Sequence, residues 1–321
     1  MTGFRAGGHR DPPFALTASG PMPRDADVTA VAPRQPAAPR RGITALLAHH
    51  PLVSFFVLAY AGTWLFELPY VLSEYGAGLL PTRSPLLLWA SPVSIFMGPF
   101  LAAFLVTGAT EGRAGIRRIL RRFVLWRVGL RWYLFALIGV PAIVVLSVVV
   151  MPGVLASFQG LSVLAPLPLL GNFLYVFFLG GALGEEPGWR GFALPRLQSL
   201  HGPLVGSLIL GPLWGLWHLP LFWTPWNELT AFNVVVYALT TTCLTITYTW
   251  AFNNTKASVL IAMLIHAVFN WTTLVVVRLF PAPILSEYGL LPILSGFGAF
   301  AVVLVALTRR GLGYRPEAGR L

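Results

Sequence analysis

The sequence predicts an all-α fold: a bundle of about eight membrane-spanning helices with both chain termini in the cytoplasm. Three observations support this prediction. Of the 321 residues, 56% are hydrophobic and only 10% are charged, whereas soluble domains carry roughly 25% charged residues. The apolar residues form continuous runs of about 20, the length at which a helix crosses the hydrocarbon core. The basic residues are concentrated in alternate connections between these runs.

The two ends of the chain differ in composition from the middle. Residues 1–42 hold seven prolines, six arginines and all three aspartates, with almost no apolar periodicity. Such a segment cannot bury enough apolar surface to offset the entropy lost on ordering. We therefore expect a disordered cytoplasmic tail over 1–42, a membrane domain over 43–312 and a short cytoplasmic tail over 313–321.

Eight apolar runs divide the membrane domain. A β-barrel would show alternating apolar and polar residues in segments of about ten, so these continuous runs predict helices. Between the second and third runs, the arginine-rich stretch 113–131 is interspersed with apolar residues and is expected to lie on the inner leaflet. The runs cover approximately 52–73, 85–107, 132–151, 168–184, 203–222, 231–251, 257–279 and 289–308.

The basic residues predict the orientation of the bundle. With the N-terminal tail inside, 20 of the 22 Lys and Arg residues face the cytoplasm and only Arg83 and Arg278 lie outside, as the positive-inside rule requires. The net charge of +11 could also indicate nucleic-acid binding. However, the arginines are spread between apolar runs, where contact with anionic lipid is their expected role. We predict a multi-pass protein of the cell membrane that contacts membrane lipids and binds no nucleic acid.

Ionisable residues inside the predicted spans are the candidates for a functional site, because a charge in hydrocarbon is costly. Glu67 stands outside any pattern and is expected to have a structural role. Most of the others fall into three patterns whose members lie four apart and so share one helical face. The patterns are E-E-x-x-x-R over Glu185, Glu186 and Arg190, W-x-x-x-H over Trp214 and His218, and H-x-x-x-N over His266 and Asn270.

The adjacent carboxylates suggest different roles. Glu186 and Arg190 are expected to neutralise each other, which leaves Glu185 as the less compensated carboxylate and a candidate general base. His218 could share a water molecule with Glu185, and Trp214 could wall the site.

The third pattern offers hydrogen-bond donors. His266 and Asn270 on one face would present two N–H groups of the kind that stabilises an oxyanion. A structural role is the alternative for each pattern taken alone, since membrane histidines and Glu–Arg pairs also join helices. The glycines near Glu185, from Gly180 to Gly188, are expected to form a close-packing face.

A shared site sets a condition on depth. If the fourth span ended at residue 184, Glu185 would lie at the surface and His218 roughly 22 Å deeper, at about 1.5 Å per residue. We therefore predict one long helix from approximately Leu167 to Ser199, bent near Pro187, with a turn at residues 201–203.

Taken together, the three patterns resemble the type II CAAX prenyl endopeptidases, the CPBP or Abi group of intramembrane proteases. The resemblance covers approximately residues 168–279 and departs from the usual pattern at Trp214, where the family has Phe. It implies that Glu185 and His218 activate water, that His266 and Asn270 form the oxyanion site, and that Glu186 and Arg190 support them. It also implies a peptide or lipidated protein as the substrate.

This sequence lacks the residues that other types of intramembrane protease require. No aspartate follows Asp27, no histidine begins an H-E-x-x-H sequence, and G-x-S-G is absent. A divalent metal such as zinc remains open, because Glu185, His218 and His266 would make a His₂Glu ligand set. The same groups could instead hold a water molecule without metal.

We therefore expect an intramembrane endopeptidase of the cell membrane, opening to the cytoplasmic side. It would hydrolyse a peptide bond near a membrane-embedded or lipidated segment. One alternative is a non-catalytic membrane protein of the same fold that binds a peptide or acts as an immunity factor. A second is a transporter that uses Glu185 and Arg190 in an ion pathway, which the absence of a detectable inverted repeat disfavours.

Overall fold

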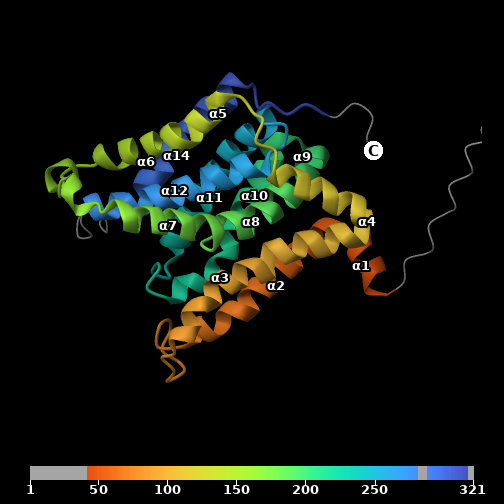
Figure 1. Cartoon of the computed structure of the whole chain (residues 1–321), viewed down its shortest axis with the longest axis horizontal. Coiled ribbons are helices and arrows are strands. Elements are labelled where there is room, and N and C mark those ends of the chain that lie inside the picture. The colour runs from red at the N-terminus through yellow and green to blue at the C-terminus, as the bar shows by residue number, and fades with distance from the viewer. Residues whose placement is uncertain (1–41, 281–287, 317–321) are drawn as a thin grey trace, which may run out of the picture. The chain divides into compact units, whose positions relative to one another are not determined.

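The computed structural model describes residues 42–280 and 288–316, and every regular element in these two ranges is helical (Figure 1). The predicted all-α class is confirmed. The expected disordered tail lies outside the described residues except for Gly42, as do residues 317–321 of the second tail.

Long helices form most of the bundle, and short helices and turns connect them. The longer helices are α2 (Pro51–Leu72), α4 (Leu101–Phe123), α7 (Pro166–Phe178), α10 (Pro203–Trp217), α11 (Ala231–Asn254), α12 (Val259–Leu279) and α14 (Leu291–Leu307). The shorter helices are α1 (Ile43–His49), α3 (Ala90–Ile95), α5 (Leu130–Leu134), α6 (Val140–Val149), α8 (Ala182–Gly188) and α9 (Leu194–His201). The 3₁₀ or π turns are η1 (Pro85–Trp89), η2 (Phe96–Phe100), η3 (Phe135–Gly139), η4 (Leu155–Ser157), η5 (Leu161–Val163), η6 (Trp189–Ala193) and η7 (Leu219–Trp223).

In the described part of the chain, seven helical segments are long and apolar enough to cross a membrane. An eighth, α14, is an apolar helix of 17 residues, which is about 25 Å long at 1.5 Å per residue. Large apolar side chains such as Leu137, Leu146 and Val302 are exposed on the outside of the bundle. A surface of this kind suits lipid rather than water, so the prediction of a multi-pass membrane protein with about eight spans is confirmed.

Helix α12 lies among the other helices, in contact with α6, α7, α8 and α11 (Figure 1). Helix α10 packs along α11, and α11 packs along α14. The α2–α4 pair packs on α8 through η2. Segments that are far apart in sequence, near residues 67, 185, 218 and 266, are thereby brought towards one another.

The second predicted span is longer than expected because α4 extends to Phe123. Gly112, at φ +62°, interrupts its helical geometry and separates an apolar arm from the arginine-rich arm 113–123. In that second arm Gly115 and Ile119 are buried, whereas Arg117 and Arg121 are exposed. The arm is therefore amphipathic, and its place on the inner leaflet stays a prediction.

The predicted long helix from Leu167 to Ser199 corresponds to one apolar helical segment, Pro166–His201, which is divided into shorter helices. The break falls at 179–181, where Gly181 adopts φ +121°, a conformation that side chains with a Cβ rarely reach. Pro187, where the bend is predicted, lies inside α8, and the π turn η6 begins two residues later. The predicted turn is confirmed, since α9 ends at His201 and α10 begins at Pro203.

The glycines of α8 make the expected close-packing face. A Cβ on Gly184 would lie 2.4 Å from a side-chain carbon of Ile95, and one on Gly188 would lie 2.6 Å from the backbone oxygen of Pro99. Helix α8 therefore approaches η2 almost backbone to backbone, and residues 184–194 are all buried. This close packing holds Glu185 and Glu186 inside the bundle.

Candidate functional site

A cavity of about 580 Å³ lies at the centre of the predicted site. Its walls come from α2, α3, α7, α8, α10, α11, α12 and α14, with the turns η1 and η7. The predicted residues that line it are Glu185, Trp214, His218, His266 and Asn270. Glu186 and Arg190 do not line it, and are fully buried behind Glu185. The structure thus brings together residues that lie as much as 85 positions apart in the sequence.

Glu185 accepts two hydrogen bonds from indole groups. Oε2 receives Nε1–H of Trp214 at 2.7 Å and Nε1–H of Trp189 at 3.2 Å. The sequence did not predict these contacts, in which two neutral N–H donors converge on one oxygen of Glu185. The other oxygen, Oε1, faces Gly181, so the two indoles hold the carboxylate in a defined orientation.

Glu186 pairs with Arg190 as predicted. Arg190 Nη1 lies 2.9 Å from Glu186 Oε1, and both side chains are completely buried. The same oxygen lies 2.8 Å from His266 Nδ1, a contact that the sequence did not predict. One carboxylate oxygen thereby connects α8, η6 and α12. Removing one partner of a buried ion pair strongly destabilises the folded protein, because the other charge is left buried without compensation.

Aromatic rings enclose the charge of Arg190. Its Cζ lies 4.2 Å from the ring centroid of Trp214 and 4.4 Å from that of Tyr248, both within cation–π range. Arg190 Nη2 donates a longer hydrogen bond of 3.4 Å to Thr245 Oγ1. Trp214 therefore contacts both Glu185 and Arg190. The sequence suggested only that Trp214 would form part of the wall of the site.

The imidazole of His218 is held against α10. Its Nδ1 lies 2.9 Å from the backbone oxygen of Trp214, and a carbonyl can only accept. Nδ1 therefore carries the proton, and in the neutral ring Nε2 is left as a hydrogen-bond acceptor. Trp226 stacks on the ring at 5.9 Å between centroids, with an interplanar angle of 8°.

His266 and Asn270 lie one turn apart on α12, and both line the cavity. His266 Nδ1 faces Glu186, whereas Nε2 faces away from Glu186, towards Gly181. The Cβ that an alanine at position 181 would add lies 3.2 Å from His266 Nε2 and 2.8 Å from Glu185 Oε1. The missing Cβ of Gly181 thus leaves space between the carboxylate and the imidazole.

The predicted zinc ligands are not assembled. Within the two described ranges, no three His, Cys, Asp or Glu side chains come together as a group that could hold a metal ion. One nitrogen of His218 and one of His266 are engaged with protein oxygens, as is common in zinc sites, but Oε2 of Glu185 is taken up by indoles. The arrangement is thus not a formed His₂Glu zinc centre, and a metal at this site stays a prediction.

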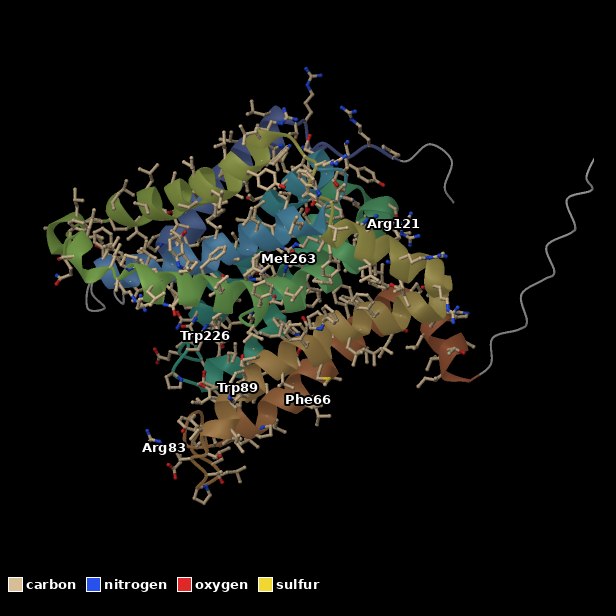
Figure 2. The ribbon with its side chains drawn as sticks, in the orientation of Figure 1. Phe66, Arg83, Trp89, Arg121, Trp226 and Met263 are labelled. Carbon is tan, nitrogen blue, oxygen red and sulfur yellow. The ribbon has the colours of Figure 1, made fainter. Side chains whose placement is uncertain are left out.

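The cavity lies in one half of the bundle. Its residues include the C-terminal parts of α2 and α10, the middle of α12 and the N-terminal part of α11. The ends of α2 and α10 lead to the connections that hold Arg83 and Trp226. Figure 2 shows Arg83, Trp89 and Trp226 at this end and Arg121 at the other. With cytoplasmic termini this half of the bundle would face the outer side, so the position of the cavity does not support the expected opening to the cytoplasm.

Sequence reasoning missed three residues of the site. Glu67, expected to be structural, lines the cavity, although its charge inside a predicted span was the available signal. Trp189 donates to Glu185 from four positions along the chain, a spacing that could have revealed it. Tyr237 lines the cavity beside His218, and nothing in its local sequence distinguishes it.

The fold and this cavity define a multi-pass helical membrane protein with a buried glutamate–histidine site. Residues 166–272 match the family model described as type II CAAX prenyl endopeptidase Rce1-like, a range that contains every predicted site residue. CAAX prenyl protease 2 of Methanococcus maripaludis is 25% identical over 183 residues, which are 54% of this chain and 68% of the relative. The resemblance to type II CAAX prenyl endopeptidases is thereby confirmed over about a third of the chain.

Proposed function

We propose that the protein is an intramembrane endopeptidase that cleaves a peptide or lipidated protein by direct attack of water, with Glu185 as the general base. The observation that carries the proposal is the orientation of Glu185. Two indole N–H groups hold Oε2, and Oε1 is left facing the space beside His266 Nε2. A water molecule in that space could give its proton to Glu185 while its oxygen attacks a carbonyl carbon.

The other lining residues have matching roles in this proposal. His218 Nε2 would accept a hydrogen bond from the attacking water, since Nδ1–H is held by Trp214. The developing oxyanion would be stabilised by the Asn270 amide and by Nε2–H of His266. His266 can donate through Nε2 only as an imidazolium, because its Nδ1–H already faces Glu186. Collapse of the tetrahedral intermediate breaks the C–N bond, and the proton on Glu185 passes to the leaving amine.

The name of the relative suggests the substrate. A CAAX prenyl protease acts on a prenylated protein, and the apolar walls of this cavity suit a lipid-bearing or membrane-embedded segment. We propose this class of substrate for the present chain.

The test compares purified protein with its Glu185→Gln variant on a membrane-tethered reporter peptide in proteoliposomes. Gln keeps the shape of the side chain and cannot accept the proton, so turnover should fall about 10²–10⁴-fold. Glu74→Gln, the same substitution at an exposed glutamate, is the control and should retain activity. Turnover near the wild-type rate in Glu185→Gln would exclude the proposed base. Binding without cleavage by the wild type would favour the non-catalytic alternative.

A further inference from the structure

Glu67 is a second carboxylate of the cavity. It belongs to α2, is 2% exposed and faces the same space as Glu185. Buried residues recur every four positions along this face of α2, at Ala59, Thr63 and Glu67. Thr63 donates a hydrogen bond of 3.0 Å to the backbone oxygen of Ser94, which ties α2 to α3 one turn from Glu67. The carboxylate is therefore held at a defined place in the wall.

An ionised carboxylate with a structural role inside a protein commonly has a cation beside it, as Arg190 lies beside Glu186. In residues 42–280 and 288–316, the ion pairs formed by glutamates involve Glu111 and Glu186, and Glu67 takes part in none. Glu67 thus contributes a carboxylate to the cavity without a protein cation to neutralise it.

Apart from the histidines, the charged side chains that line the cavity are negative. Its described lining holds Glu67 and Glu185 but no Lys or Arg, and Arg190 lies behind, against Glu186. An acidic substrate group here would meet like charge in a poorly solvated space, whereas an ammonium or guanidinium group would find a partner. Selection of this kind uses repulsion of the wrong group as well as attraction of the right one.

We infer that Glu67 is a specificity-determining residue, which accepts a basic side chain of the substrate segment bound in the cavity and disfavours an acidic one. This inference rests on the proposed function, because it concerns the substrate of the same site. Ser91 and Tyr70 also line this part of the wall, and their hydroxyl groups can complete the hydrogen bonding of the carboxylate.

The test uses pairs of membrane-tethered reporters that differ only by Lys or Glu at one position, scanned through the residues that flank the scissile bond. At one position the wild type should prefer Lys by about tenfold or more in kcat/KM, a difference of about 1.4 kcal/mol. Glu67→Gln should abolish that preference and Glu67→Lys should reverse it. Glu228→Gln removes an exposed charge next to the lining residue Asn227 and should leave the preference unchanged.

The ratio of two substrates on one protein sample does not depend on how much of the variant is folded. If Glu67→Gln lowers kcat/KM equally for both reporters, or if the wild type shows no preference at any position, the inference is wrong. If the wild type cleaves no reporter, the proposed function fails. The inference is then decided by equilibrium binding of the same Lys and Glu peptides to the wild type and to Glu67→Gln. A Lys preference that Glu67→Gln removes would support it, and equal binding would overturn it.

Discussion

His266 Nδ1 and Glu186 Oε1 lie 2.8 Å apart, and Arg190 Nη1 lies 2.9 Å from the same oxygen. Glu186 therefore orients a residue of the cavity wall while it neutralises a buried guanidinium. A histidine whose Nδ1–H faces a carboxylate has its ring plane and its tautomer determined by that contact. Any change at Glu186 or Arg190 should for this reason affect both the stability of the fold and the position of His266.

The first prediction concerns this ion pair. Arg190→Ala leaves Glu186 buried without its strongest partner, and the free energy of unfolding should fall by about 3–5 kcal/mol. Denaturant unfolding in detergent, followed by tryptophan fluorescence, measures the loss. Arg196→Ala is the matched control, because its pairing with Glu111 is partly exposed and should contribute at most about 1 kcal/mol. The pairing assignment would be refuted if the double variant Glu186→Gln/Arg190→Ala were no more stable than the less stable single variant.

The second prediction concerns Gly181. An alanine there would place its Cβ 2.8 Å from Glu185 Oε1 and 3.2 Å from His266 Nε2, in the space proposed for water and substrate. Displacing either group by about 1 Å can cost 10²-fold in rate, so kcat for Gly181→Ala should fall at least that far. Gly171→Ala is the control, since its Cβ would meet nothing within 4 Å. A Gly181→Ala variant with an unchanged kcat would show that this space is not used.

The third prediction concerns the indole of Trp214. Trp214→Phe keeps an aromatic ring over Arg190 but removes the N–H that lies 2.7 Å from Glu185 Oε2. Hydrogen bonds to charged groups contribute about 1.5–3 kcal/mol, so a less firmly held Glu185 should lower kcat about tenfold or more. Trp64→Phe removes an indole N–H that is bonded to a backbone oxygen and should leave kcat unchanged. Equal effects of the two substitutions would argue against an orienting role for Trp214.

The fourth prediction concerns orientation in the membrane. With the arginine-rich end in the cytoplasm, the cavity opens towards the outer side. In a Cys243→Ser background, a membrane-impermeant thiol reagent applied to intact cells should label Arg83→Cys and spare Arg309→Cys. Labelling of both positions after the cells are permeabilised is the control. The reverse pattern in intact cells would place the cavity on the cytoplasmic side and the termini outside.

The membrane fold could be predicted from the sequence because burial in lipid imposes length and composition on each helix separately. All eight apolar runs correspond to helices of the described chain, and the turn at 201–203 lies where His201, Gly202 and Pro203 predict it. The pairing of Glu186 with Arg190 was also predictable, since residues four apart meet on one helix regardless of what surrounds that helix.

The environment of each site residue depended on contacts between helices, which local spacing does not encode. The indoles that hold Glu185 come from η6 and α10, and the carboxylate that orients His266 comes from α8. Glu67 joins the cavity because α2 packs on α3. The position of the cavity in one half of the bundle likewise depends on which helix ends pack together. The sequence by itself determined the helices and the residue types of the site, through periodicity and the cost of charge in lipid. Only the tertiary structure decided which groups face one another, because side chains from different helices meet only when the helices pack.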